Sequence, residues 1–294
     1  MTDTGLLDPS SVRALAARLG LRPTKQRGQN FVVDANTVRR IVLAAQVSAA
    51  DVVLEIGPGL GSLTLGLLET GARVVAVEID DLLAGVLPDT VRTRMPERTD
   101  ALDVICADAM RVDTLPIAPT AVVANLPYNV AVPILLHLLA RFDSWTRGLV
   151  MVQAEVAQRL VAEPGGKIYG IPSVKLAWYA ESAWAGSVSA SVFWPAPNVE
   201  SGLVAIRRRP APRTSASREE VFGVVDAAFA QRRKMLRSSL SPLVGSSAVA
   251  SAVLEAAGVD PRARGEVLGV GEFARVAEQL AAARARAALD PDAH

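Results

Sequence analysis

Short apolar runs alternate with helical stretches between residues 52 and 152 of this 294-residue chain. The helix-like stretches include Leu63–Leu68 and Val132–Leu139. Strands that are regularly separated by helices predict a mostly parallel sheet that is covered on both faces, so the fold class that we expect is α/β. The runs with the length and composition of buried strands are Val52–Ile56, Arg73–Val77, Val104–Cys106, Ala121–Ala124 and Leu149–Val152.

The pattern changes after the helix-like stretch Ser173–Trp178. Two strand-like runs, Ser187–Val192 and Leu203–Arg207, flank the proline-rich Phe193–Pro197 and resemble an antiparallel hairpin that finishes the sheet. Residues 209–217 have the prolines and small side chains of a linker, and helical stretches are predicted beyond it over 219–230, 232–240, 248–257 and 273–286. We therefore expect a catalytic domain over 1–210, including an N-terminal helical and basic segment at 1–33, and a helical domain over 211–294.

Composition excludes several classes of protein. Half of the residues are apolar, yet no uninterrupted apolar run reaches the ~18 residues that a membrane span needs. The N-terminus shows no basic-then-apolar signal pattern. The single cysteine, Cys106, cannot form an internal disulfide, and its apolar neighbours suggest a small buried residue. We expect a soluble cytoplasmic protein.

The net charge is +1, but the charges are unevenly distributed. Residues 31–204 carry 12 basic and 18 acidic side chains, whereas residues 205–240 carry nine basic and three acidic ones. Residues 1–30 have a surplus of three positive charges. Clustered positive charge beside an acidic body predicts a polyanionic partner, and an ordinary solvated face is the alternative.

A glycine-rich loop follows the first predicted strand in the sequence Glu55-Ile56-Gly57-Pro58-Gly59-Leu60-Gly61. The glycines allow a tight turn into a helix and a close approach of the backbone to a ligand. Their spacing is Gly-x-Gly-x-Gly, not the Gly-x-Gly-x-x-Gly of dinucleotide binders. Because Pro58 also removes an N–H that a pyrophosphate could use, the loop argues against NAD.

Acidic residues end the next two predicted strands. Glu78 lies 21 residues after Gly57 and is suited to accept hydrogen bonds from both ribose hydroxyls. Asp108 could accept a hydrogen bond from an adenine amine. Taken singly, each could equally be a helix cap or a surface turn. Taken together they predict a nucleoside cofactor without a pyrophosphate, for which S-adenosylmethionine is the candidate, and the pattern resembles the class I methyltransferase fold.

Asn125-Leu126-Pro127-Tyr128 follows the fourth apolar run directly. This places an amide, a backbone carbonyl and an aromatic ring at the end of a predicted strand, where open parallel sheets bind their ligands. Such a set could grip a flat heterocycle that carries an exocyclic amine.

Five motifs then occur in order: Gln29-Asn30-Phe31, Glu55-Ile56-Gly57-Pro58-Gly59, Asn125-Leu126-Pro127-Tyr128, Phe193-Trp194-Pro195-Ala196-Pro197 and Gln231-Arg232-Arg233-Lys234. Over residues 22–280 the chain resembles the ribosomal RNA adenine N6-dimethyltransferase family. The resemblance implies a Rossmann-like catalytic domain, S-adenosylmethionine as cofactor, and transfer of methyl groups to adenine N6.

The resemblance also implies roles for individual residues. Asn125 and the backbone of Leu126 and Pro127 would contact the target amine, while Tyr128 and Phe193 would sandwich the base. Core packing is the alternative for both rings. The cofactor would be held by Asn30, Val32, Gly57, Gly59, Glu78, Ile79, Asp108, Ala109 and Asn125. No metal site is expected.

The chemistry agrees with that assignment. An adenine N6 amine is a poor nucleophile because its lone pair is delocalised into the ring. The Asn125 side-chain oxygen and the Pro127 carbonyl can accept both N–H groups and favour a more tetrahedral nitrogen. Orientation then matters more than proton abstraction. The chain has only two histidines, and His137 is expected to pack within an apolar helix.

A basic run lies in the helical domain. The expected helix would place Arg233 and Arg237 on one face, with Arg232 and Lys234 alongside, and phosphate contact is its functional interpretation. A solvated amphipathic helix is the alternative. Lys25 and Arg27 in the N-terminal loop could add contacts to the same RNA. The implied partner is 16S rRNA within the immature 30S subunit, bound by a monomer.

Three functions remain open from the sequence. The favoured one is dimethylation of two adjacent adenosines in the 3′-terminal hairpin loop of 16S rRNA, because the sequence from Phe229 to Arg237 resembles the housekeeping branch of the family. A rival is an Erm-like enzyme that modifies 23S rRNA and blocks macrolides. The third is a non-catalytic ribosome assembly factor on the same scaffold. An NAD-dependent oxidoreductase is disfavoured by the glycine spacing.

Overall fold

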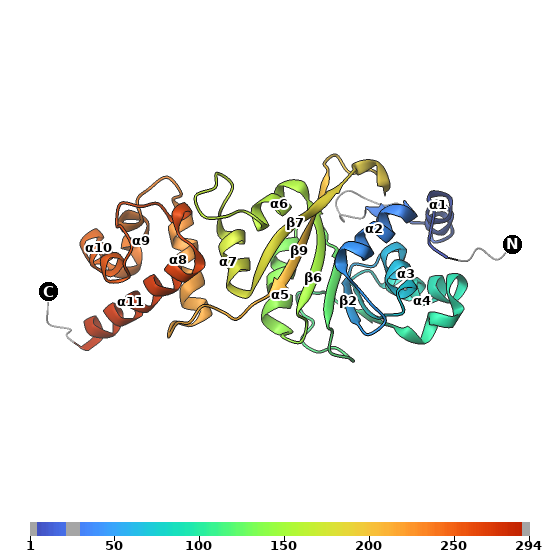
Figure 1. The fold of residues 1–294 in the computed structure, drawn as a ribbon, viewed down its shortest axis with the longest axis horizontal. Coiled ribbons are helices and arrows are strands. Elements are labelled where there is room, and N and C mark those ends of the chain that lie inside the picture. Colours follow the sequence, from blue (N-terminus) through green and yellow to red (C-terminus); the bar gives the residue numbers. More distant parts are fainter. Residues whose placement is uncertain (1–4, 22–29, 290–294) are drawn as a thin grey trace. The chain divides into compact units, whose positions relative to one another are not determined.

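The computed structural model describes residues 5–21 and 30–289 and divides into two compact units (Figure 1). The first unit contains residues up to 158 together with 181–208. The second contains 159–180 and the chain from 209 onward, so the C-terminal helices fold together with an earlier segment. The expected division of labour, catalysis by 1–210 and RNA binding by 211–294, stays a prediction.

A seven-stranded sheet forms the centre of the first unit, in the order β4-β3-β2-β5-β6-β9-β7. The pairs from β4 through to β6 are parallel, and β9 runs antiparallel to β6. The α/β fold with a mostly parallel sheet is therefore confirmed. Its strands are β2 (Val52–Ile56), β3 (Arg73–Glu78), β4 (Leu102–Cys106), β5 (Ala121–Asn125), β6 (Arg147–Gln153), β7 (Ala180–Val188) and β9 (Ser201–Arg208).

Two expectations about this sheet are wrong. The strand expected over 187–192 ends at Val188, since β7 begins earlier, and residues 190–192 form a short 3₁₀ turn. Cys106, expected to be buried, is exposed. It ends β4, which lies at the edge of the sheet and is only partly covered along its length.

Helices cover the sheet, and the central strands are buried at almost every position, as strands with two covered faces should be. α2 starts at Ala35, and the carboxylate of the preceding Asp34 caps it by accepting a 2.7 Å hydrogen bond from the Thr37 N–H. The helices of this unit are α1 (Pro9–Arg18), α2 (Ala35–Ala45), α3 (Ser62–Glu69), α4 (Asp81–Arg94), α5 (Ala131–Arg141) and α6 (Ala154–Leu160).

The strand order reverses direction between β2 and β5, which lie side by side in the sheet. Open α/β sheets bind ligands outside the carboxyl ends of the strands at such a switch point. The glycine loop follows β2, and Asn125 is the last residue of β5. The topology therefore brings together two motifs that are about seventy residues apart in sequence.

A second, two-stranded sheet was not expected from the sequence. β1 (Phe31–Val32) pairs antiparallel with β8 (Phe193–Trp194), so that Phe31 faces Trp194 and Val32 faces Phe193. A further backbone hydrogen bond of 2.8 Å runs from the Val33 N–H to the Val192 carbonyl. Strands of two residues are too short to leave a period in the sequence.

The second unit is helical and has its own apolar core, which includes Tyr169, Val225, Leu254 and Phe273. α8 begins with a capping box in which Ser217 and Glu220 each bind the other's backbone N–H. The helices are α7 (Ile171–Tyr179), α8 (Arg218–Ala230), α9 (Leu236–Val244), α10 (Ser247–Ala256) and α11 (Val270–Leu289).

Among the described residues, no single helix is long and apolar enough to cross a membrane. α9 and α10 reach that length and hydropathy only as a pair, across a bend of 108°.

Candidate active site

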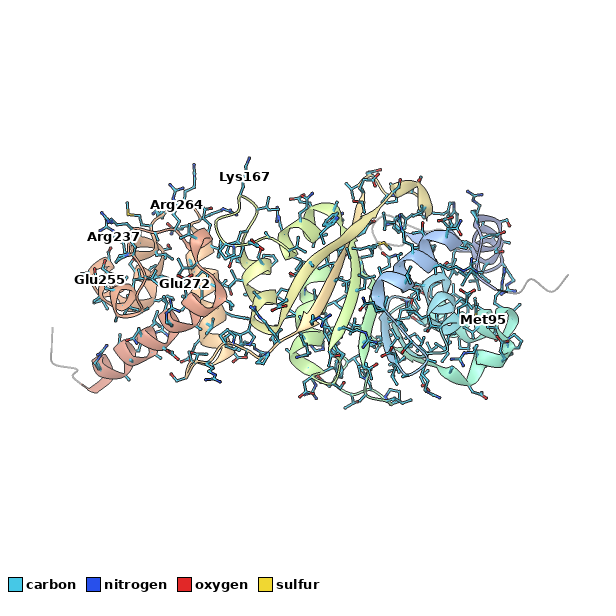
Figure 2. All side chains as sticks on the ribbon, in the orientation of Figure 1. Met95, Lys167, Arg237, Glu255, Arg264 and Glu272 are labelled. Carbon is cyan, nitrogen blue, oxygen red and sulfur yellow. The ribbon has the colours of Figure 1, made fainter. Side chains whose placement is uncertain are left out.

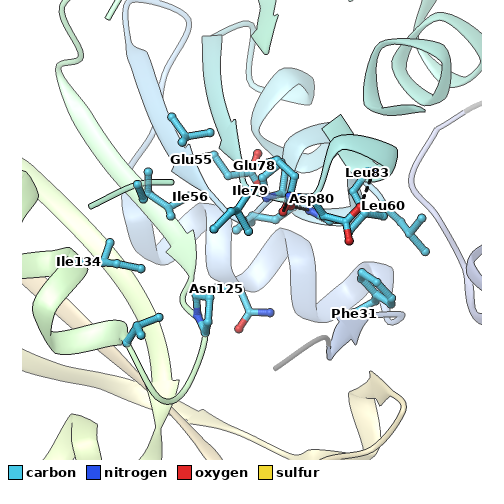
Figure 3. Close-up of a pocket in the computed structure, with 18 of the residues that line it drawn as sticks. Phe31, Glu55, Ile56, Leu60, Glu78, Ile79, Asp80, Leu83, Asn125 and Ile134 are labelled. Carbon is cyan, nitrogen blue, oxygen red and sulfur yellow. Dashed lines mark hydrogen bonds between the residues drawn. The ribbon is translucent and has the colours of Figure 1, made fainter. Parts of the chain in front are cut away.

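A cavity of about 640 Å³ opens at the carboxyl ends of β2, β3, β4 and β5, in the first unit. Its volume lies in the range of small-molecule sites. Figure 3 shows Glu78 and Ile79 on one side of the cavity, with Asn125 opposite them. The predicted residues that line it are Asn30, Val32, Gly57, Gly59, Glu78, Ile79, Asp108, Ala109, Asn125 and Pro127.

The glycine loop runs between β2 and α3 with its glycines at positive φ, +67° at Gly57 and +58° at Gly59. A Cβ built on Gly59 would lie 2.8 Å from Cε1 of Phe31, so that side chain closes directly over the loop. The Gly57 N–H donates to the Val77 carbonyl at 2.9 Å. Any side chain at 59 would be strained by its backbone and would also displace the Phe31 ring.

Glu78 ends β3 and is buried, with 6% of its surface exposed. Its two carboxylate oxygens accept hydrogen bonds from the Gly59 N–H and the Asp80 N–H, each at 3.1 Å. Burial raises the pKa of this carboxyl above its usual value, against these hydrogen bonds. Each oxygen keeps a lone pair, so the carboxylate can still accept hydroxyl groups of a sugar.

Glu55 is a buried carboxyl that the sequence reasoning did not single out as a site residue. It lies on β2, lines the cavity, and accepts a 2.7 Å hydrogen bond from the Thr64 hydroxyl. Burial raises the pKa of Glu55 to about 8, and the nearby Glu78 adds to that shift. An acidic residue inside an otherwise apolar strand was the signal that could have identified it.

Replacing Glu55 by glutamine is expected to change how stability depends on pH. Between its ordinary pKa of 4.5 and about 8, the folded protein holds a proton on Glu55 that the unfolded chain has released. The free energy of unfolding therefore falls as pH rises through this window, by several kcal/mol at about 1.4 kcal/mol per pKa unit. Glu55→Gln should lack that decline, because the amide stays neutral and still accepts from Thr64.

Chemical denaturation of both proteins between pH 5 and pH 9 measures this difference. Glu69→Gln is the matched control, since Glu69 is a partly exposed residue paired with Arg39 on the surface. Wild type and Glu55→Gln with the same pH slope would contradict the assignment.

The adenine end of the predicted cofactor site lies at the end of β4. Asp108 is partly exposed, and its carboxylate accepts a 2.9 Å hydrogen bond from the Met110 N–H. Ile79 is 67% exposed and Met110 39% exposed, and both line the cavity, so they present apolar surface to a ligand there. Met110 was missed from the sequence, although it directly follows the predicted pair Asp108 and Ala109.

Asn125 is predicted to contact both the cofactor and the target adenine. Its side-chain Nδ2 donates to the Asn30 carbonyl at 3.2 Å, which joins the end of β5 to the residue before β1. Among its neighbours, Leu126 is buried in the core and Pro127 lines the cavity. The Pro127 carbonyl accepts a 3.3 Å hydrogen bond from the Val130 N–H, and one of its lone pairs remains.

The two predicted base-stacking rings lie apart from the cavity lining just described. Tyr128 is partly buried, its hydroxyl lies 3.1 Å from Ser201 Oγ, and burial raises its pKa. Phe193 is 3% exposed and packs in the core cluster of the first unit. A base can stack on the Phe193 ring only if the side chains that bury this ring move away, so the stacking role of Phe193 stays a prediction. His137 packs as expected, with Nε2 3.1 Å from the Val112 carbonyl.

The residues around the cavity fit S-adenosylmethionine. Glu78 offers a charged acceptor for ribose, the glycines let the backbone approach closely, and Ile79 and Met110 offer apolar surface for an adenine. In the described chain, no group of three or more His, Cys, Asp and Glu side chains could hold a metal ion.

The predicted RNA-binding helix over 232–240 is wrong. α8 ends at Ala230, residues 231–235 form a turn, and α9 starts only at Leu236. The N–H groups of Leu236 and Arg237 donate to the carbonyls of Ala263 and Pro261, and this pairing fixes the start of α9. Arg233 and Arg237 therefore do not share a helix face.

Arg232 does not extend freely into solvent. Its guanidinium donates to the Glu266 carboxylate at 3.1 Å and to the Lys167 carbonyl at 2.6 Å, which ties three loops of the second unit together. Arg233 and Lys234 are exposed beside it. Lys25 and Arg27 lie outside the described residues.

Some of the arginines over 205–240 make contacts within the protein instead of extending into solvent. Arg208 donates to the Leu139 carbonyl and lies over the Trp145 ring, and Arg209 donates to the Ala177 carbonyl. The uneven charge distribution therefore overstates the basic surface that is available to a partner.

The solved structures that resemble this chain share its fold. A dimethyladenosine transferase from Plasmodium falciparum matches with a TM-score of 0.69 and 21% identity, over 83% of this chain and 94% of that one. The 23S rRNA methyltransferase ErmE matches with a TM-score of 0.64 and 26% identity, over 86% of this chain and all of that one.

Proteins found by sequence have a much higher identity to this chain than these solved structures do. The chain is 62% identical to ribosomal RNA small subunit methyltransferase A of Cutibacterium acnes, over 97% of this chain and 98% of that protein. It is 65% identical to the protein of the same name from Streptomyces coelicolor, over 94% and 98%. The model of the ribosomal RNA adenine dimethylase family matches residues 21–282. The chain belongs to this family and is an S-adenosylmethionine-dependent rRNA adenine dimethyltransferase.

Proposed function

We propose that the chain dimethylates N6 of two adjacent adenosines in the 3′-terminal hairpin loop of 16S rRNA, as a cytoplasmic monomer acting on the immature 30S subunit. The observation that carries the proposal is the position of Asn125. It lies at the switch point of the sheet, beside the glycine loop and across the cavity from Glu78. The identity of 62–65% to small subunit methyltransferases supports the choice of rRNA.

In this reaction the protein orients two substrates. Bound S-adenosylmethionine supplies an electrophilic methyl group with its own leaving group. The N6 lone pair forms the new N–C bond while the methyl–sulfur bond breaks, and N6 then loses a proton to water. Asn125 Oδ1 and the Pro127 carbonyl accept from N6 and aim its lone pair, while Tyr128 and Phe193 are proposed to hold the ring by stacking.

We also propose that the second unit contacts RNA phosphates through exposed cations on its loops. Arg233 and Lys234 lie on the turn before α9, and Figure 2 shows Lys167 and Arg264 extending toward the same edge of this unit. Arg232 is assigned a different task, since its bonds to Glu266 and to the Lys167 carbonyl hold these loops. Arg237, partly exposed on α9, belongs to the same set. Lys25 and Arg27, in the N-terminal segment of the first unit, are proposed to add contacts to the same RNA.

The experiment that tests the function supplies labelled cofactor with immature 30S particles, 50S particles or naked rRNA, and maps the methylated adenines. We expect two neighbouring dimethyladenosines in 16S rRNA. Label confined to 23S rRNA would instead support the second candidate, which the 26% identity to ErmE keeps in the design. Cofactor binding without transfer to any RNA would support a non-catalytic assembly factor.

A further inference from the structure

The β1–β8 pair joins the cofactor side of the first unit to the segment that carries Phe193. β1 directly follows Asn30, whose carbonyl binds Asn125, and β8 contains Phe193 itself. Two short strands so far apart in sequence have little pairing energy of their own. Side-chain contacts must therefore hold their register.

The Asn30 carbonyl determines which way the Asn125 amide faces. A backbone carbonyl can only accept hydrogen bonds, so the atom of Asn125 that lies 3.2 Å from it must be the Nδ2 donor. The opposite orientation would place two oxygen atoms against each other. Asn125 Oδ1 is consequently turned away from Asn30 and is free to accept. A displacement of Asn30 would release this orientation.

The side chains of Phe31 and Trp194 are in contact across the pair. Their rings stack with centroids 6.5 Å apart and planes 26° apart. Phe31 is 8% exposed, and its other edge closes over Gly59 in the loop whose N–H binds Glu78. Trp194, on the partner strand, does not line the cavity, and it directly follows Phe193 in β8.

We propose that the Phe31–Trp194 stack makes the β1–β8 pair the positioning element of the acceptor site. It keeps Asn30 where its carbonyl orients Asn125, and it keeps Phe193 in register with Val32. Trp194 is thus a positioning residue, which acts through Asn125 and Phe193. The inference rests on the proposed transfer to adenine N6.

The second methylation should depend most on this element. Unmodified N6 offers two N–H groups to the two acceptors, whereas monomethylated N6 has only one. A loosened Asn125 therefore hinders the second transfer more than the first, and monomethyladenosine should accumulate. A misplacement of about 1 Å can cost on the order of 10²-fold in rate.

The test compares Trp194→Ala, Trp194→Leu and Trp194→Phe with wild type on 30S particles. For the first two we expect kcat to fall about 10- to 100-fold, with a higher ratio of monomethyl- to dimethyladenosine. Cofactor affinity, measured by calorimetry without RNA, should fall less than kcat does, because β1 also contributes Val32 to the cavity lining. Trp194→Phe keeps an aromatic ring and should restore both rate and product ratio. Trp184→Ala removes another tryptophan of the same unit, 41% exposed on β7, and should behave as wild type.

A measurement on the free protein checks the orientation directly. The chain contains five asparagines, so asparagine-selective ¹⁵N labelling resolves the side-chain amide of Asn125. Its protons should exchange faster with solvent in Trp194→Leu than in wild type, and Trp194→Phe should reverse the change.

Three results would overturn the inference alone. They are a Trp194→Leu variant with wild-type kcat and product ratio, a defect in that variant confined to cofactor affinity, and an unchanged exchange rate of its Asn125 amide protons. Absence of transfer by the wild type would instead remove the proposed function, and the inference with it. The wild-type reaction therefore separates the two failures.

Discussion

Replacing Asn125 by alanine is expected to lower kcat about 10²- to 10³-fold, the cost of removing one hydrogen-bonding group that is aimed at the reacting centre. Asn125 is the last residue of β5, at the switch point of the sheet, and alanine there leaves N6 with only a backbone acceptor. Stability should fall by only about 1 kcal/mol, since one hydrogen bond to the Asn30 carbonyl is lost. Single-turnover transfer to 30S particles measures the loss.

Asn125→Asp sharpens this prediction. Aspartate keeps the shape and the acceptors of the side chain but cannot donate to the Asn30 carbonyl, so an oxygen faces an oxygen. We expect it to be nearly as inactive as the alanine variant. Asn129→Ala, an exposed asparagine four residues later on the same loop, is the matched control. Full transfer by Asn125→Ala, or a cofactor affinity that falls as much as kcat does, would refute the assignment of Asn125 to the acceptor site.

The sheet and the cofactor side of the site were accessible to sequence reasoning because their signals are local. Each buried strand is a contiguous apolar run, and the carboxyl ends of parallel strands meet by topology alone. Gly57, Glu78 and Asp108 could therefore be placed together before the structure was known. The position of Asn125 could be predicted in the same way, because it follows another apolar run and so lies at the carboxyl end of a parallel strand.

The features that escaped prediction depend on pairings between distant segments. The β1–β8 pair joins residues about 160 positions apart, and nothing in Phe31–Val32 indicates its partner. In the sequence, Arg232 is one more cation in a basic run. In the structure it donates to the Glu266 carboxylate and to the Lys167 carbonyl. An aromatic residue such as Phe193 suits both a stacking surface and an apolar core, so its burial could not be derived from its type.

Glu78→Gln is expected to weaken cofactor binding about 100-fold. Both oxygens of Glu78 already accept backbone N–H groups, from Gly59 and Asp80. An amide has only one acceptor atom, so its NH₂ group must face one of these donors, and the charge that strengthens hydrogen bonds from ribose is lost as well. Hydrogen bonds to a charged group contribute about 1.5–3 kcal/mol each, and 1.4 kcal/mol is tenfold in affinity.

The pH dependence of cofactor binding is a second, independent test of the role of Glu78. Burial raises the pKa of Glu78, and the form that accepts two ribose hydroxyls is the ionised one. Wild-type affinity should therefore rise as pH increases through that pKa, whereas Glu78→Gln should lack this rise. Calorimetric titrations from pH 5 to pH 8 measure both effects, with Glu69→Gln as a control that retains wild-type affinity. If Glu78→Gln bound the cofactor with unchanged affinity at every pH, the carboxylate would serve only to tie the Gly59 loop to β3.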